Sequence, residues 1–295
     1  MSRKLAKPKP IVFWLFLAPI ILMFFVNTVL PIFVSIYYSL FNWSGGRTMS
    51  FVGMRNYLEL LHDYEFWGSA RNNLIIVIIC TVGQVGIALI ISFLLVSAKL
   101  KLKEFHRTVI FFPVTVSALV IGFVWSLIYN KDYGLLNYFL QSLRLENLIL
   151  PWLDNPKYIL ITASIPVVLQ YVGLYMIMFM ASIKGISEEV LECASLDGCT
   201  DFQRSIHIIL PMIYSTFKVA VMLCVSGTMK IFDHILVLTN GGPGKSSQVL
   251  ALYAYNISFD RMKFSYGSTI AIGILVLSLG ITMASRALLG GKRYE

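Results

Sequence analysis

Long apolar runs alternate with short polar segments along the whole chain. A helix of about 20 apolar residues crosses the roughly 30 Å hydrocarbon core of a bilayer. Runs of this kind occupy residues 11–40, 72–97, 108–129, 158–182, 212–238 and 264–288. The pattern therefore predicts an all-α integral membrane protein with six transmembrane helices.

The distribution of basic residues predicts the orientation of these helices. Lys and Arg are enriched in cytoplasmic loops. Two segments of this chain, before the first run and after the second, carry clusters of them: Arg3, Lys4, Lys7, Lys9, Lys99, Lys101, Lys103 and Arg107. We therefore expect both termini, and the polar segment 183–211, to be cytoplasmic. No small-residue cleavage site follows the first run, so we expect an uncleaved span.

Composition excludes several other classes. The chain is 57% hydrophobic and 13% charged, which does not fit a soluble domain. Its net charge of +9 is explained by the flanks of the spans, and no basic stripe or aromatic platform accompanies it, so a nucleic-acid partner is not expected. The four cysteines form no CxxC pair, and neither a disulfide framework nor a metal site is predicted.

The polar segment between the fourth and fifth spans is rich in acids: Glu188, Glu189, Glu192, Asp197 and Asp201. Ser187 is suited to cap a helix, and Gly198 is suited to end it in a left-handed conformation. Thr200 and Gln203 have the spacing of a capping box for a second helix, which Pro211 ends or kinks. The segment predicts two short helices in water. A merely solvated loop stays open as the plainer interpretation.

The same segment carries a motif at fixed spacing. Six positions match the E-A-A-x-x-x-G-x9-I-x-L-P motif of bacterial ABC importer permeases: Glu192, Ala194, Gly198, Ile208, Leu210 and Pro211. Cys193 departs from it, but Cys is small and tolerates burial. The resemblance implies the type I ABC importer transmembrane fold over residues 72–288. It implies a tail, first helix and external loop over 1–71, and a cytoplasmic tail over 289–295.

In that family, segment 183–211 is the coupling loop that docks on an ATPase subunit. The resemblance places seven residues at this interface: Glu192, Cys193, Ala194, Asp197, Gly198, Leu210 and Pro211.

The last third of the chain is similar to one branch of the family. Phe232-Asp233, the run 239–243, Tyr253-Ala254-Tyr255 and the run 264–267 resemble carbohydrate-uptake permeases of the MalF-like, multiple-sugar type. This resemblance implies import of an oligosaccharide across the bacterial cell membrane. It implies four partners: a second homologous permease, two ATPase subunits that bind ATP and Mg, and an extracellular substrate-binding protein.

Polar residues inside spans are candidates for the substrate path, because they are costly in lipid. Sugars need aromatic faces and paired donors and acceptors. The candidates are Trp125, Gln170, Tyr171, Gly227, Thr228, Lys230 and Asp233. Lys230 and Asp233 are three apart, so we expect them on one helical face, within pairing distance. Interhelical packing is the plainer interpretation for Gln170, Tyr171 and Thr228, and a structural ion pair is the plainer one for Lys230 with Asp233. Trp125 and Tyr129 fit aromatic-belt anchors, which is the interpretation we favour for Tyr129.

Other functions fit parts of the same pattern. A permease for another solute, such as a polyol or glycerol phosphate, fits as well. An ion-coupled secondary transporter fits less well. That class often carries acidic residues deep in its spans and has repeated halves, whereas here Asp233 is the only acidic residue within a predicted span and no repeat is visible. No catalytic motif falls within a span and no Walker motif occurs, so we expect a transport subunit, not an enzyme, with ATP hydrolysed by its partners.

Overall fold

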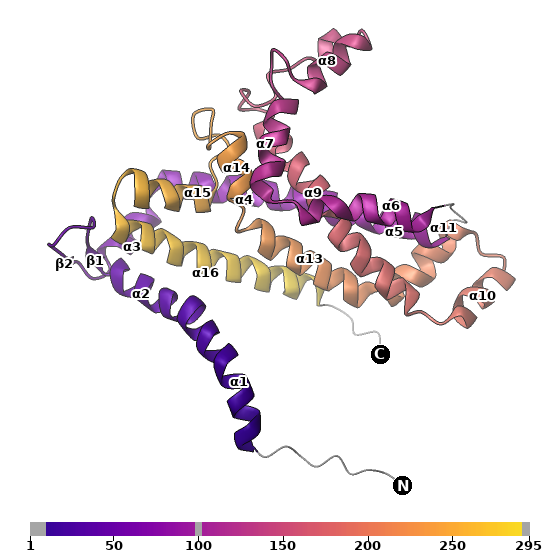
Figure 1. Ribbon diagram of the computed structural model, residues 1–295, viewed down its shortest axis with the longest axis horizontal. Helices are drawn as coiled ribbons and strands as arrows, with labels where there is room; N and C mark the ends of the chain where they lie inside the picture. The colour runs from indigo at the N-terminus through magenta and orange to yellow at the C-terminus, as the bar shows by residue number, and fades with distance from the viewer. Residues whose placement is uncertain (1–9, 98–101, 291–295) are drawn as a thin grey trace. The chain divides into compact units, whose positions relative to one another are not determined.

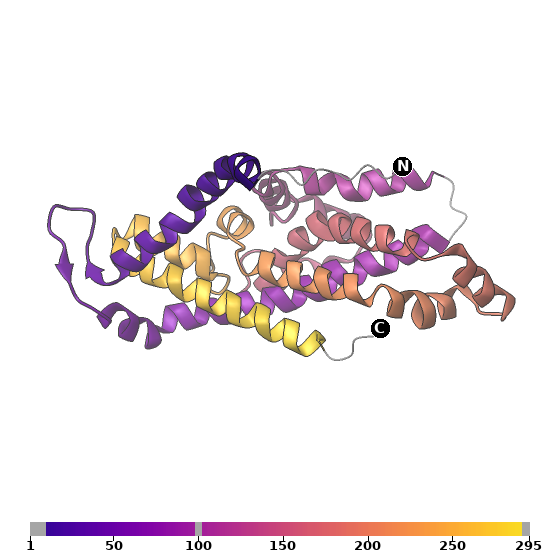
Figure 2. The same cartoon turned by 90° about the horizontal axis from the view of Figure 1, so that it is seen from below.

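The computed structural model describes residues 10–97 and 102–290 and is predominantly helical (Figures 1 and 2). Part of the predicted basic clusters lies outside the described residues, namely Arg3, Lys4, Lys7, Lys9, Lys99 and Lys101, as does most of the predicted tail 289–295. The chain divides into two compact units, residues 10–63 with 254–274 and residues 64–253 with 275–290, which are described separately.

The first unit begins with one long apolar helix. It comprises α1 (Pro10–Phe24), the π-helical η1 (Phe25–Val29) and α2 (Leu30–Ser39). Pro19 lies inside α1, and Pro31 is the second residue of α2, directly after η1 in the same continuous helix. Over Val12–Ser39 this helix is long and apolar enough to cross a membrane. The first predicted span is therefore confirmed as a helix.

A small hairpin and a short helix follow α2. Strands β1 (Phe41–Asn42) and β2 (Ser50–Phe51) pair antiparallel, and α3 (Arg55–Leu61) comes next. Asn56 of α3 donates to the Ser39 and Phe41 carbonyls at 2.7 and 2.8 Å, which satisfies backbone acceptors at and beyond the end of α2.

The later part of this unit holds η6 (Asn256–Asp260) and the beginning of α16 (Phe264–Leu289). The Ser265 N–H donates to the Trp43 carbonyl at 3.3 Å, and the Tyr266 hydroxyl donates to Asp63 Oδ2 at 2.6 Å. These bonds hold the two segments of the unit together.

The second unit is built around α9 (Ile159–Lys184), whose Met176 and Phe179 are fully buried. A second long helix, made of α4 (Tyr64–Cys80), η2 (Thr81–Val85) and α5 (Gly86–Ser97), packs along it. The other elements are α6 (Lys103–Phe111), η3 (Phe112–Thr115), α7 (Ala118–Ile128), α8 (Leu135–Ser142), η4 (Glu146–Leu148), α10 (Glu188–Leu196), α11 (Asp201–Arg204), η5 (Ser205–Ile209), α12 (Leu210–Met212), α13 (Tyr214–Thr228), α14 (Asp233–Leu238) and α15 (Leu250–Tyr255).

Close packing on α9 depends on one glycine. A Cβ at Gly173 would overlap the Ile110 carbonyl oxygen, so α6 approaches α9 at backbone distance. Small residues allow such approaches between membrane helices.

Two of the predicted spans are not straight helices. The third bends by 100° between η3 and α7, so α7 leaves α6 almost at a right angle (Figure 1). Pro113 lies in the preceding 3₁₀ turn, and Val116 is extended. The fifth bends by 74° at Ile213, two residues after Pro211. The prediction of a single helix was wrong for the third span. The break beside Pro211 is confirmed, since the sequence predicts that the preceding helix ends or kinks there.

The fifth span also ends earlier than predicted. Helix α13 stops at Thr228, and α14 begins only at Asp233. Asn73, which is fully buried, lies with its Nδ2 3.4 Å from the Thr228 and Met229 carbonyl oxygens. A side-chain donor of this kind satisfies backbone acceptors that a broken helix leaves unpaired.

The remaining span boundaries are close to the prediction, except that the second helix starts at Tyr64 instead of residue 72. Glu65 in its first turn is favoured by the helix dipole, and Phe66 is buried. In the described part of the chain, four helices are long and apolar enough to cross a membrane, and counting each bent pair as one span gives six.

Candidate functional site

A cavity of about 350 Å³ lies inside the second unit, among α9, α13 and the turn that joins α13 to α14. Its polar or aromatic lining includes Gln84, Tyr171, Tyr175, Thr228, Lys230, Asp233 and His234. Five of the seven predicted path residues line it: Tyr171, Gly227, Thr228, Lys230 and Asp233. The structure therefore brings together residues from the fourth and fifth spans.

Lys230 and Asp233 are both exposed within this lining. In the part of the chain that the structure describes, they form no ion pair within 4.0 Å. The expected helical face does not exist, because Lys230 lies in the turn after α13 and Asp233 begins α14. The prediction that these two residues share one helix face was wrong, and each charge lines the cavity separately.

Gln170 lies beside the cavity rather than among its lining residues. Its side chain is buried, and its Nε2 donates to the Val116 carbonyl at 2.9 Å. Its Oε1 lies 2.6 Å from His234 Nε2. His234 was not predicted as a site residue, because nothing in the sequence places it against a residue 64 positions earlier.

Gln84 is a second lining residue that was missed from the sequence. It is buried, its Nε2 donates to the Val167 carbonyl at 3.2 Å, and its Oε1 lies 3.2 Å from Cys224 Sγ. The sequence contained a signal for this role, because Gln84 is a polar residue within an apolar run, and such residues face cavities or partner helices.

Trp125 is not among the residues that line this cavity. It packs against Tyr129, with 5.0 Å between the ring centroids. Tyr129 is buried, and its hydroxyl donates to the Thr162 carbonyl at 3.1 Å. The aromatic-belt interpretation of Tyr129 was wrong, because the ring is enclosed by the chain and its hydroxyl is already paired.

The acidic segment forms the predicted helical hairpin. Helix α10 runs over Glu188–Leu196, and Gly198 has φ +81°. The Cys199 N–H donates to the Ala194 carbonyl at 3.0 Å, and the Gly198 N–H donates to the Ser195 carbonyl at 3.2 Å. This pair of bonds is the Schellman arrangement, which needs a left-handed residue. The conformation predicted for Gly198 is confirmed.

The second helix of the hairpin begins at the predicted capping box. The Thr200 hydroxyl accepts from the Gln203 N–H at 3.3 Å, and the Gln203 side chain accepts from the Thr200 N–H at 2.9 Å. At the first helix, Ser187 occupies the N-cap position without a side-chain cap bond. The cap role predicted for the Ser187 side chain was therefore wrong, although its position was right.

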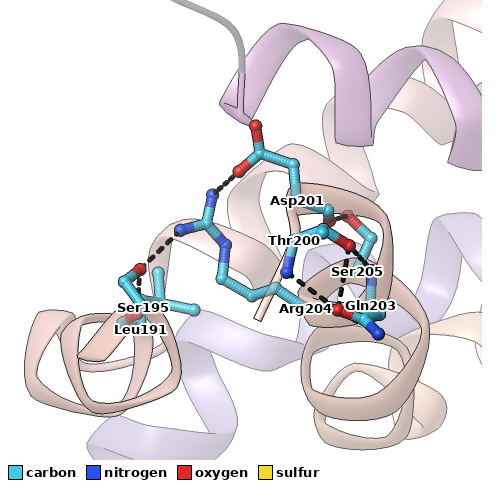
Figure 3. A network of polar contacts seen from close by, with 7 residues as sticks. All are labelled: Leu191, Ser195, Thr200, Asp201, Gln203, Arg204 and Ser205. Carbon is cyan, nitrogen blue, oxygen red and sulfur yellow. Dashed lines mark hydrogen bonds and ion pairs between the residues drawn. The ribbon is translucent and has the colours of Figure 1, made fainter. Parts of the chain in front are cut away.

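Arg204 links the two helices of the hairpin, as Figure 3 shows. Its Nη1 donates to Ser195 Oγ of α10 at 3.1 Å, and its Nη2 donates to Asp201 Oδ1 at 2.6 Å. The Arg204 side chain is 19% exposed. The hairpin is therefore held at two places, by the Schellman turn and by this bridge.

The predicted interface residues differ in exposure. Glu192, Cys193, Asp197, Gly198 and Pro211 are exposed, Leu210 is half-buried, and Ala194 is buried. Burial of Ala194 and exposure of its neighbours show that α10 presents one face to the chain and another to its surroundings.

Two further apolar side chains are strongly exposed on the hairpin: Leu196 at 87% and Phe202 at 72%. Neither was selected from the sequence. The hairpin therefore exposes apolar as well as acidic side chains.

The hairpin and the segment 239–248 lie at different ends of the second unit. Asp201 and Phe202 lie beside Leu94 near the end of α5, around an apolar groove. Lys245 instead pairs with Glu65 in the first turn of α4. The α10–α11 hairpin lies at the end of the unit where α5 finishes (Figures 1 and 2).

Residues 84–288 match the family model of the binding-protein-dependent transport system inner membrane component. The chain belongs to this family. It is a multi-pass membrane component of an ABC importer, and family membership makes it a transport subunit instead of an enzyme. The four to six candidate spans of the described residues agree with this assignment.

Full-length relatives support the same family. The probable ABC transporter permease YurN of Bacillus subtilis is 35% identical, with 92% of this chain and 93% of YurN covered. The multiple sugar-binding transport system permease MsmF of Streptococcus mutans is 29% identical, with 96% of both chains covered. The lactose transport system permease LacF of Rhizobium radiobacter is 28% identical, with 90% of this chain and 89% of LacF covered.

Solved structures show the fold. A chain in the crystal structure of a bacterial ABC transporter involved in the import of the acidic polysaccharide alginate has a TM-score of 0.81 to this chain. The two are 17% identical, and 94% of each is covered. The type I importer fold is therefore shown.

Among the described residues, no group of three or more His, Cys, Asp or Glu side chains could hold a metal ion.

Proposed function

We propose that this permease carries an oligosaccharide through the cavity among α9, α13 and α14. The observation that carries the proposal is the lining itself, where Tyr171 offers an aromatic face and Thr228, Lys230 and Asp233 offer hydroxyl, donor and acceptor groups. Sugars require this combination of an apolar face and paired polar contacts. The lactose and multiple-sugar permeases among the relatives support the same solute class.

We assign residues 72–288 to the transmembrane domain, with residues 1–71 and 289–295 flanking it. The family match begins at residue 84, but residue 84 lies inside a continuous helix over Tyr64–Val96. The helix therefore continues the matched region toward the N-terminus, and its apolar part, from residue 72, is assigned to the domain.

We also propose that the α10–α11 hairpin, within the coupling loop 183–211, docks on an ATPase subunit. Its support is the exposed acidic and apolar surface of Glu192, Leu196 and Phe202 on a hairpin fixed at two places. In this assembly, two ATPase subunits bind ATP and Mg, a second similar permease completes the pathway, and an external binding protein delivers the sugar. Both termini are cytoplasmic.

One experiment tests the solute and the assembly together. The complete importer is reconstituted in vesicles, and ATP hydrolysis is measured with the binding protein and a panel of neutral oligosaccharides, polyols and glycerol phosphate. Stimulation by oligosaccharide-loaded binding protein supports the proposal. Stimulation only by glycerol phosphate would show that the solute is a phosphate ester and not an oligosaccharide. Lys230 would then supply the positive charge that binds the phosphate.

A further inference from the structure

One buried amide connects both helix breaks that border the cavity. Gln170 lies within α9, the helix around which the second unit is built. Its Nε2 donates to the carbonyl of Val116, at the 100° bend between η3 and α7. Its Oε1 contacts His234 Nε2 in the first turn of α14, directly after the break that follows α13.

The orientation of this amide is fixed by its partners. A rotated amide would place its oxygen against the Val116 carbonyl, and two acceptors cannot bond to each other. The Gln170 oxygen therefore accepts a hydrogen bond from His234, whose ring carries a hydrogen on Nε2. The amide nitrogen and the amide oxygen then both have a partner, as buried polar groups require.

The two broken segments are also packed against each other. A Cβ at Gly122 of α7 would lie 3.2 Å from Val237 Cβ and 3.7 Å from the His234 Cα, so α7 and α14 meet at backbone distance. Ala118 at the start of α7 and His234 both line the cavity. Movement of this pair of helices away from α9 would therefore change the cavity.

We propose that Gln170 and His234 form a latch that pins the bent third span and α14 to α9 and so controls how freely the cavity opens. His234 acts here as a positioning residue. Gln170 donates a hydrogen bond to the Val116 carbonyl, which has no helical partner at the bend. The bend is therefore held in place as long as the hydrogen bonds of the latch persist. When they break, α7 and α14 are released together.

A matched pair of substitutions separates the hydrogen bond from simple packing. His234→Gln places an amide donor near the position of the imidazole Nε2, whereas His234→Asn places its donor nearer to the position of Nδ1. Both variants remove the ring and introduce the same chemical group. Only His234→Gln is expected to keep the bond to Gln170.

The readout is the reaction of Cys224, a cavity-lining and 1% exposed cysteine, with a small polar maleimide. The importer is purified without nucleotide or sugar, with Cys80, Cys193 and Cys199 replaced by alanine. His234→Asn should raise the labelling rate by roughly threefold to twentyfold, the range expected for loss of one interhelical hydrogen bond. His234→Gln should label at the parent rate.

Two further variants keep the test decisive. Gln170→Met removes both bonds at similar volume and should also raise labelling. Ser182→Ala removes a different bond, between Ser182 and Thr216 at 2.9 Å, and should leave the rate unchanged. Equal acceleration by His234→Gln and His234→Asn, or parent rates in both His234→Asn and Gln170→Met, would overturn the latch. Because labelling needs neither sugar nor ATP, this failure is distinct from failure of the proposed solute.

Discussion

The Arg204 guanidinium of α11 donates to the Ser195 hydroxyl of α10 across 3.1 Å. The same guanidinium contacts Asp201 of its own helix (Figure 3). The bond joins the two helices of the hairpin through residues nine positions apart in sequence. The hairpin is therefore suited to transmit force as one body.

Arg204→Met should loosen the hairpin while leaving the membrane helices folded. The methionine keeps the apolar stem but loses both polar contacts, and a hydrogen bond to a charged group contributes roughly 1.5–3 kcal/mol. Attachment of the ATPase should weaken by about tenfold or more, measured by titrating the ATPase onto immobilised permease. Arg107→Met, which removes an exposed i,i+3 pair with Glu104, is the control and should bind as the parent does. Equal binding by both variants would contradict a bracing role for Arg204.

Lys230 and Asp233 should act independently of each other. Lys230 lies in the turn after α13, Asp233 begins α14, and the two form no ion pair in the described part of the chain. The losses in transport from Lys230→Ala and Asp233→Ala, expressed as free energies, should therefore add to within about 0.5 kcal/mol in the double variant. A double variant that transports better than Lys230→Ala alone would show a pair that the structure does not contain.

Cysteines that line the cavity should be protected by substrate. Tyr171→Cys and Thr228→Cys should react with a polar thiol reagent, and the transported sugar should slow the reaction, because both side chains line the cavity. Leu169→Cys is the control, since Leu169 is 46% exposed and does not line this cavity. Sugar-independent labelling at all three positions, measured by mass spectrometry, would contradict a substrate path here.

The local turn chemistry of the hairpin was predictable from the sequence. Gly198 and the Thr200–Gln203 pair act within a few residues, so their spacing alone specifies the geometry. The breaks at Val116 and after Thr228 were not predictable in the same way. Hydropathy identifies an apolar run but does not distinguish a straight helix from a bent one. The partners that stabilise the breaks are distant in sequence: Gln170 for Val116 and Asn73 for Met229.

The candidate site was only partly predictable from the sequence for the same reason. Tyr171 and Thr228 were recognised because they are polar or aromatic within apolar runs. The Gln170–His234 contact joins α9 to α14 and depends on how the bent helices pack. Leu196 and Phe202 were missed because exposure of an apolar side chain is a property of the folded hairpin.

Coupling of this permease to its ATPase through the α10–α11 hairpin is tested by changing two exposed residues. Glu192→Lys reverses a charge on the hairpin. Gly198→Val places a β-branched residue at φ +81°, which costs roughly 1–2 kcal/mol in the left-handed region. Glu146→Lys in the segment between α8 and α9 and Gly198→Asn, which tolerates that conformation, are the controls.

The deciding measurement is co-purification of the ATPase with each variant, alongside sugar uptake. We expect Glu192→Lys and Gly198→Val to reach the membrane and to retain binding of the sugar-loaded binding protein, but to lose the ATPase and uptake, while both controls keep them. Attachment and uptake at the parent level in Glu192→Lys and Gly198→Val would contradict the coupling role of the hairpin.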